Sequence, residues 1–233
     1  LFQNYFDAIR EFETETPRSY TSVPFSRVIT VEQEIPAGVE IYPFDKVSKY
    51  IAESDLISIG NCYCRHFGEL LDNPCTKPKE NCFSFGPQAK FMVARGFNKA
   101  VTKEEALNIL NEAEEAGLVH CSSNTSENIH FICNCCSCHC GIMNSIKVSD
   151  RPNAAASSNF IMSINKDECI SCGDCIDRCQ VEAITMEGND VVHNLERCIG
   201  CGLCISSCLT GALSLVPREV VTIPPATQQD LVT

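Results

Sequence analysis

Cysteines spaced for metal binding dominate the C-terminal part of the chain. The stretches CISCGDCIDRC and CIGCGLCISSC begin at Cys169 and Cys198, and each places four cysteines as C-x2-C-x2-C-x3-C. A short loop with this spacing wraps three thiolates around one [4Fe-4S] cluster, and the next turn of chain carries the fourth thiolate to a neighbouring cluster. A zinc site built from paired CxxC units, or a disulfide knot, fits two such runs poorly. The spacing therefore predicts two interleaved [4Fe-4S] clusters.

Over residues 160–216 the chain resembles the bacterial two-cluster [4Fe-4S] ferredoxins. The resemblance implies two ligand sets, Cys169, Cys172, Cys175 and Cys208 for one cluster and Cys198, Cys201, Cys204 and Cys179 for the other. The proline that usually follows each fourth cysteine is replaced by Gln180 and Leu209. These replacements leave the ligands intact but bear on turn geometry and reduction potential, because backbone N–H groups near the sulfurs help to set the potential.

The other ten of the 18 cysteines lie upstream and also fall in groups. The simplest partition assigns Cys62, Cys64, Cys75 and Cys82 to a third cluster and four of Cys133, Cys135, Cys136, Cys138 and Cys140 to a fourth. Cys121, alone on an expected strand, is then a spare buried thiol. Alternatively, a single site draws one CxC from each run. Iron–sulfur clusters are favoured over zinc for the whole region, because a chain already rich in clusters can use more of them.

The second upstream run, FICNCCSCHCG, cannot direct all its thiols to one cluster. Side chains alternate along an extended chain, and this alternation is broken between Cys135 and Cys136, so some members must turn away. His139 is an alternative ligand, although a histidine between two cysteines is more often a bystander. Arg65 and His66 follow Cys62 and Cys64, where they could tune the reduction potential of a cluster, although a surface ion pair is the simpler expectation.

Residue patterns predict the elements that hold these cysteines. Apolar periodicity predicts helices over 1–15, 45–53 and 88–95, and alternation predicts strands over 27–35 and 56–59. Asp45 is expected to cap its helix. The second strand runs into Cys62 and Cys64, which point to the same side if the segment stays extended.

A capping box predicts one more helix. Thr102 and Glu105 mark its start, and Gly117 ends it after Ala116. Residues 118–120 and 129–132 then predict a β-hairpin that leads to the second upstream run. Helix followed by hairpin weakly resembles the second half of a winged-helix domain, which is analogy and not evidence of DNA binding.

The predicted fold class is α+β. A small α/β cysteine-rich Fe-S domain is expected over 1–148, a linker over 149–159, a ferredoxin-like two-cluster domain over 160–216 and an extended tail over 217–233. The layout of CYCR, then CNCC, then a two-cluster unit resembles ferredoxin-type 4Fe-4S binding proteins of anaerobic bacteria and archaea that carry an extra upstream cysteine-rich domain. This resemblance implies electron transport in anaerobic metabolism.

The formal net charge of −12 disfavours nucleic-acid binding, which depends on Lys and Arg neutralising phosphates. Acidic carriers dock on basic patches of other proteins, so we expect redox partners, including a larger catalytic oxidoreductase subunit in a hetero-oligomer. Metal-spaced cysteines indicate a reducing compartment. No stretch has the length of a membrane span and the first residues are unlike a signal peptide, so a cytoplasmic location is expected.

A [4Fe-4S] cluster held by four thiolates transfers single electrons. No phosphate-binding loop, nucleotide fingerprint or nucleophile with a base accompanies the cysteines, so no catalytic residue is predicted. The expected function is a non-catalytic electron-transfer subunit with two C-terminal clusters and one or two more upstream. Two alternatives remain open: an enzyme with an open three-cysteine cluster in the N-terminal domain, and a redox sensor whose winged helix binds DNA.

Overall fold

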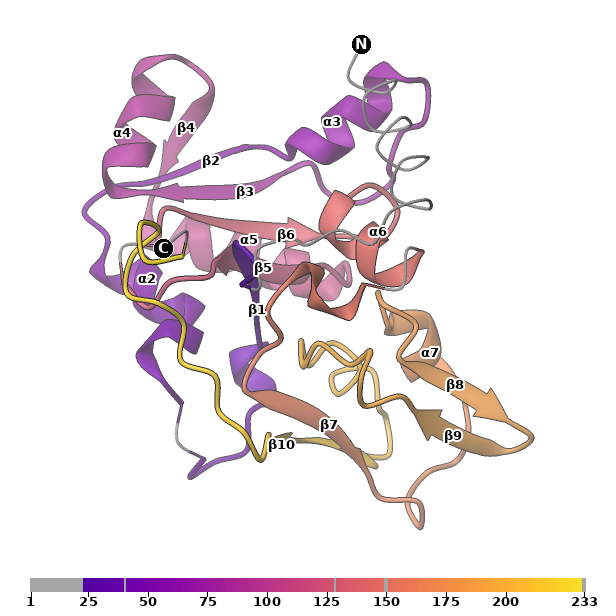
Figure 1. Cartoon of the computed structure of the whole chain (residues 1–233). Helices are drawn as coiled ribbons and strands as arrows, with labels where there is room; N and C mark the ends of the chain where they lie inside the picture. Colours follow the sequence, from indigo (N-terminus) through magenta and orange to yellow (C-terminus); the bar gives the residue numbers. More distant parts are fainter. Residues whose placement is uncertain (1–22, 40, 128, 149–150, 232–233) are drawn as a thin grey trace, which may run out of the picture.

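The computed structural model describes residues 23–39, 41–127, 129–148 and 151–231. A six-stranded antiparallel sheet of order β1-β5-β6-β3-β2-β4 crosses the upper part of the molecule in Figure 1. Its strands, in sheet order, are Ser26–Ile29, Val119–Ser123, Phe131–Cys135, Glu80–Phe85, Ile57–Asn61 and Asn98–Val101.

Two helices cover one face of this sheet. Helices α2 (Val47–Glu53) and α5 (Lys103–Glu115) contact each other, and α5 also contacts β2 and β3. Ile59, Phe83 and Ile132 from three neighbouring strands form a buried core with side chains of both helices. Burying this apolar face is the main stabilisation of the upstream domain.

The opposite face of the sheet carries cysteines. Successive side chains of a strand point to opposite faces, so Cys82 beside Phe83 and Cys133 beside Ile132 point away from α2 and α5. Cys121 lies directly opposite Cys133 in the pairing of β5 with β6 and shares its face. The alternation in β3, β5 and β6 thus places Cys82, Cys121 and Cys133 on the face opposite α2 and α5.

Helix α3 (Tyr63–Leu70) follows β2, and helix α6 (Gly141–Lys147) follows β6. Both lie beyond the same end of the sheet in Figure 1. Helix α4 (Gly86–Ala94) joins β3 to β4 at the opposite end. The cysteines that begin α3 and α6 therefore meet at one end of the sheet.

The C-terminal unit lies below the sheet in Figure 1 and contains two small two-stranded sheets. Strand β7 (Phe160–Ile164) pairs with β10 (Leu213–Pro217), and β8 (Ile184–Glu187) pairs with β9 (Asp190–His193); a short helix, α7, spans Asp174–Arg178. In the part of the chain that the structure describes, the 3-10 turns are η1 at Glu32–Glu34, η2 at Pro43–Asp45 and η3 at Pro152–Ala154.

Several local predictions are confirmed. The capping box is present, with Thr102 Oγ1 accepting from the Glu105 backbone N–H, and Gly117 follows the helix at φ +72°. Strands β5 and β6 form the predicted hairpin. This hairpin is interior to the sheet, because β5 also pairs with β1 and β6 also pairs with β3, whereas a wing projects from its domain.

Other local predictions need correction. Of the strand predicted over 27–35, only residues 27–29 lie in β1 (Ser26–Ile29), and a 3-10 turn follows. Asp45 does not cap α2, because its carboxylate instead binds Arg27 at 2.8 Å in the interior. Cys64 lies in the first turn of α3 and not on an extended segment. Strands β3 and β4 were not predicted, and the helix expected over 1–15 lies outside the described residues.

The segments predicted as linker and tail lie against the body of the protein. Ala155 and Ser158 are buried, and Ala156 bridges to Arg27 of β1. In the tail, Pro225 O accepts from the Ser126 N–H at 2.9 Å. Both segments therefore help to join the C-terminal unit to the sheet.

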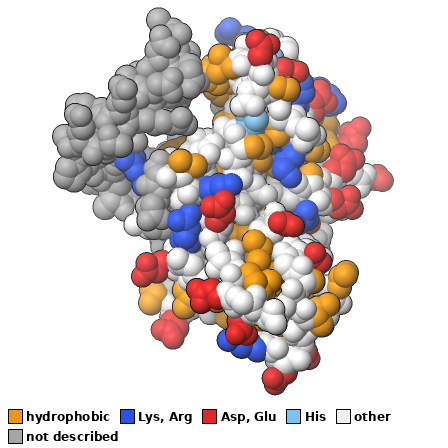
Figure 2. Space-filling view, turned by 90° about the vertical axis from the view of Figure 1, so that its right-hand side faces the viewer, with side chains coloured by type: hydrophobic (Ala, Val, Ile, Leu, Met, Phe, Trp, Pro, Cys, Tyr) orange, Lys and Arg blue, Asp and Glu red, His pale blue; other side chains and the backbone are white. Residues whose placement is uncertain are grey.

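Figure 2 shows acidic and basic side chains interspersed with small hydrophobic strips on one face of the molecule. Within the described ranges, the helices are too short or too polar to cross a membrane.

Candidate metal centres

The first three cysteines of the run that begins at Cys169, together with Cys208, surround a cavity in the C-terminal unit. Its cysteines are Cys169, Cys172, Cys175 and Cys208. Ser171, with φ 56°, and Gly173, with φ 89°, turn the loop, and α7 begins directly after it. Cys172 is exposed and Leu209 is 88 % exposed, so this cavity lies close to solvent.

A second cavity is lined by the other four cysteines of the C-terminal unit, Cys179, Cys198, Cys201 and Cys204. Ile199 and Leu203 line it as well and are almost completely buried. Burial raises the pKa of Cys201 to about 12, so binding a metal there must displace a proton.

Each cavity thus presents four thiols around an open space. Four soft thiolate donors around such a space match the donor set of a [4Fe-4S] cluster.

The upstream cysteines form a closed arrangement of a different kind. Six thiols make a closed six-cysteine ring, in which each interacts with the next, in the order Cys62, Cys64, Cys140, Cys135, Cys133 and Cys82. Hydrogen bonds from Cys64 and Cys82 lower the pKa of Cys62 far below its ordinary range. The ring gathers residues from the start of α3, from β3 and β6 and from the start of α6, so only the folded chain assembles it.

Cys121 was expected to be an isolated spare thiol. It is buried as expected, but it contacts the ring through Cys135. The reason is its position opposite Cys133 in the β5–β6 pairing, which directs both side chains to the same face.

Arg65 is interior, and the expectation of a surface ion pair is wrong for this residue. Its side chain donates to the carbonyl of Asn134 at 3.1 Å and to Cys136 Sγ at 3.6 Å, and it also binds Asn81 Oδ1. Burial lowers the pKa of Arg65, and the neighbouring thiols, led by Cys62, more than offset this effect. A buried cation among cysteines offsets the negative charge that metal-bound thiolates bring. His66 does form an exposed pair, 3.6 Å from Glu69.

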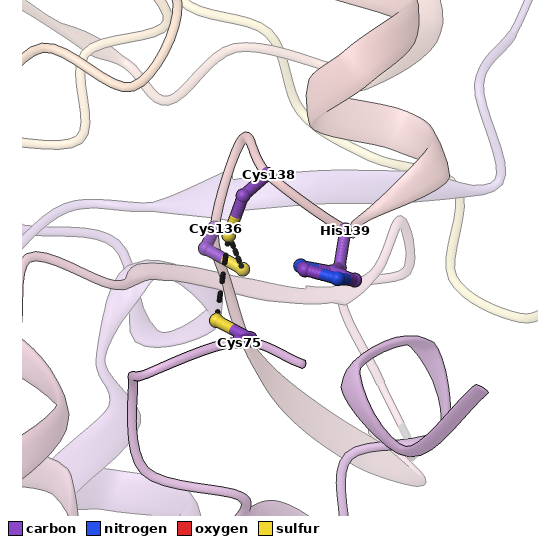
Figure 3. Close-up of side chains that lie close together, drawn as sticks. All are labelled: Cys75, Cys136, Cys138 and His139. Carbon is purple, nitrogen blue, oxygen red and sulfur yellow. Dashed lines mark hydrogen bonds between the residues drawn. The ribbon is translucent and has the colours of Figure 1, made fainter. Parts of the chain in front are cut away.

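The remaining upstream cysteines form a second group, the Cys75 group, made of Cys75, Cys136, Cys138 and His139. Figure 3 shows the three sulfurs converging, with the imidazole ring beside them. Cys138 Sγ lies 3.1 Å from Cys136 Sγ and 3.4 Å from Cys75 Sγ. Cys136 also packs against Ala113 and Leu118, at the end of α5.

The structure therefore gathers the upstream cysteines differently from the expected partition, in which Cys75 joined Cys62, Cys64 and Cys82. The second upstream run divides after Cys135, where the alternation of side chains is broken as expected. Its last cysteine, Cys140, belongs to the ring again and lies at the start of α6. The two-residue spacing of Cys133 and Cys135 predicts that both side chains lie on the same side of the strand. The sequence carried no signal that Cys75, in a loop, would cross to Cys138.

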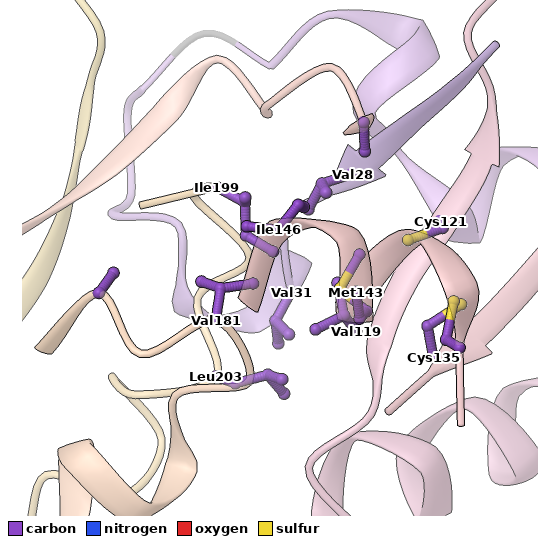
Figure 4. Close-up of a cluster of buried hydrophobic side chains, with 13 residues drawn as sticks. Val28, Val31, Val119, Cys121, Cys135, Met143, Ile146, Val181, Ile199 and Leu203 are labelled. Carbon is purple, nitrogen blue, oxygen red and sulfur yellow. The ribbon is translucent and has the colours of Figure 1, made fainter. Parts of the chain in front are cut away.

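The six-cysteine ring adjoins the second cavity through a shared hydrophobic core, which includes Cys121, Cys135, Met143, Val181, Ile199 and Leu203 (Figure 4). Cys179, Cys198 and Cys201 of the cavity pack against this core. One further link uses a residue that replaces a proline, since Gln180 Oε1 accepts from the backbone N–H of Ser137 at 3.0 Å. A different core joins Cys179, Cys198 and Cys204 of the second cavity to the cysteines of the first, so the second cavity packs against both the first cavity and the ring.

Comparison with known proteins identifies part of the chain. Residues 162–215 match the family model of the 4Fe-4S dicluster domain. This segment holds both cysteine runs and both cavities, so the chain contains a ferredoxin-type 4Fe-4S domain that supports an iron–sulfur electron-transfer role. No curated protein matches the chain.

Proposed function

We propose that this protein relays single electrons, through several [4Fe-4S] clusters, between a redox donor and a larger oxidoreductase partner. The observation that carries the proposal is the pair of four-cysteine cavities within the segment that matches the dicluster domain. When bound, a [4Fe-4S] cluster with four thiolate ligands supplies one-electron transfer.

The two cavities take different parts in this relay. Cys169, Cys172, Cys175 and Cys208 would hold the outer cluster, and Cys198, Cys201, Cys204 and Cys179 the inner one. Ile170 and Leu209 stand exposed at the outer cavity, with 65 % and 88 % of their surfaces accessible, and offer apolar contacts to a partner. Ile199 and Leu203 exclude water from the inner cavity. A partner would therefore exchange electrons at the outer cavity.

The six-cysteine ring is the proposed site of an upstream cluster. It offers more thiols than one cluster needs, and Arg65 supplies a buried positive charge beside them. The shared core in Figure 4 supports a route from the inner cavity to the ring. Electrons would then pass from the outer cavity through the inner one to the ring, or in the reverse direction.

The cellular setting is part of the same proposal. The 18 cysteines form no disulfide and are spaced for metal binding, which favours a reducing compartment, and we assign the protein to the cytoplasm of an anaerobic cell. The acidic surface charge suits docking to a basic face of the oxidoreductase in a hetero-oligomer.

Metal analysis and electron paramagnetic resonance of the full chain, purified and reconstituted without oxygen, test this proposal. Three clusters require about 12 iron atoms per chain. The Cys201→Ser variant should lose about four of them and the magnetic coupling between the remaining reduced clusters. A triple variant, Cys62→Ser, Cys64→Ser and Cys133→Ser, leaves only three thiols in the ring and should also lose about four iron atoms.

Cys121→Ser is the matched control, because it removes a buried thiol that lies beside the ring but is not one of its six members. This control should keep its iron content and its spectrum. Full iron content and an unchanged spectrum in the triple variant would refute the upstream cluster. Absence of any reducible cluster in Cys201→Ser and in the parent chain would refute the relay.

A further inference from the structure

The Cys75 group differs from the two cavities in how closely its donor atoms approach one another. All four ligand atoms lie within 4.8 Å of one another, and two sulfur pairs are only 3.1 and 3.4 Å apart. Bonds of 2.3 Å to one tetrahedral zinc ion place two sulfurs about 3.8 Å apart. A [4Fe-4S] cluster separates its thiolates further, because each thiolate binds a different iron. The spacing of this group suits a single ion.

The imidazole of His139 is oriented as a metal ligand. Its Nε2 lies 2.7 Å from the carbonyl oxygen of Asn73, so Nε2 carries the proton and donates it. The other nitrogen, Nδ1, is buried and has no hydrogen-bond partner among the described residues. A zinc-bound histidine commonly donates its second ring N–H to a backbone carbonyl, which leaves the other nitrogen free to bind the metal.

Helix α3 leaves room for this ring only because residue 68 is glycine. A Cβ added at Gly68 would overlap Cδ2 and Nε2 of His139 and would lie 2.9 Å from Asn73 O. The φ of Gly68 does not lie in the left-handed region, so the space beside the ring, not the backbone conformation, restricts this position. The helix, the Asn73 carbonyl and the imidazole therefore fit as one unit.

The electrostatics of the group also suit a bound dication. Three thiolates and one neutral imidazole around Zn2+ leave a net charge of about −1. The guanidinium of Arg65, 3.6 Å from Cys136 Sγ, lies beside that charge. A single cation thus compensates the site.

We infer that Cys75, Cys136, Cys138 and His139 bind one structural zinc ion, separate from the iron–sulfur clusters. Four protein ligands close the coordination sphere, as in structural and not catalytic zinc sites. The ion would fasten the loop that carries Cys75 to the loop between β6 and α6. It would thereby brace the segment in which Ser137 binds Gln180 of the dicluster domain.

Zinc analysis and zinc-edge X-ray absorption of the anaerobically purified full chain test the inference without any mutation. We expect about one zinc per chain, with three sulfurs at about 2.3 Å and one nitrogen at about 2.0–2.1 Å. A chain that binds no zinc when supplied with it, or a zinc shell without nitrogen, would overturn the assignment.

Variants separate this site from the clusters. Cys75→Ser and His139→Ala should each weaken zinc binding at least tenfold in competition with a chromophoric chelator, while iron content stays unchanged. Gly68→Ala should weaken it as well, because the ring is displaced. Cys121→Ser, outside the group, should bind zinc like the parent. A loss of about four iron atoms in Cys75→Ser would place Cys75 in a cluster and refute the inference.

Discussion

Gly200 offers a test of how tightly the C-terminal run that begins at Cys198 is held against the rest of the protein. It lies between Cys198 and Cys201 at φ +69°, and an added Cβ would overlap the carbonyl oxygen of Phe160 and the hydroxyl of Ser158. Its own carbonyl accepts from Thr30 Oγ1 and Ser158 Oγ, both at 2.7 Å. The peptide therefore cannot shift to relieve the overlap without breaking these bonds.

The expected cost of Gly200→Ala has two parts. A left-handed backbone costs a non-glycine residue about 1–2 kcal/mol. Overpacking of a well-packed site adds about 1–3 kcal/mol. We expect a loss of about 2–5 kcal/mol in the free energy of unfolding, and weaker retention of iron at the inner cavity.

Gly173→Ala is the matched control. Gly173 has φ +89°, but a Cβ there would meet open space, so only the backbone part applies, about 1–2 kcal/mol. The assay is anaerobic denaturant unfolding followed by circular dichroism, with iron counted before and after a chelator challenge. Equal losses of stability in the two variants would show that the contacts of Gly200 with its neighbours do not restrict the run that begins at Cys198, and would refute the reasoning.

Three further predictions concern the framework. Asp45→Asn should lower the free energy of unfolding by about 3–5 kcal/mol, because it leaves the buried Arg27 uncompensated; Lys99→Ala, which breaks an exposed ion pair, should cost about 1 kcal/mol or less in the same unfolding assay. Burial, with a smaller contribution from a nearby arginine, lowers the pKa of His193 in the folded state, so stability should be full above about pH 6.5 and should fall as pH drops below it. Thermal unfolding at pH 7.5 and 5.5 should show a smaller drop in the His193→Asn variant, and an unchanged drop would contradict this assignment. Gln180→Ala should destabilise the protein by about 0.5–1.5 kcal/mol through loss of one hydrogen bond, whereas Gln180→Glu keeps the acceptor and should be milder, which chemical unfolding can measure.

The two C-terminal runs were readable from sequence because their ligands are local. Three cysteines of each run lie within one short loop, so spacing alone brings them together. The helix with Thr102 and Glu105 was readable for the same reason, since a capping box is formed within one turn.

The upstream ligands could not be grouped in this way. Cys75 and Cys138 are far apart in the sequence, and each lies in a loop whose path depends on the packing around it. Asp45 shows the same limit. Its carboxylate could cap the nearby helix or pair with the distant Arg27, and it pairs with Arg27 because that buried cation needs a partner.

The sequence by itself determined the chemistry of this protein: cysteine spacing specifies thiolate ligation of iron–sulfur clusters, and strand alternation determines which thiols share a face. Only the tertiary structure decided how the upstream thiols divide between the six-cysteine ring and the Cys75 group, and that the inner cavity adjoins the ring. The physical reason is that ligand type is a local property of the chain, whereas a metal site assembled from distant strands and loops exists only after the sheet has buried its core.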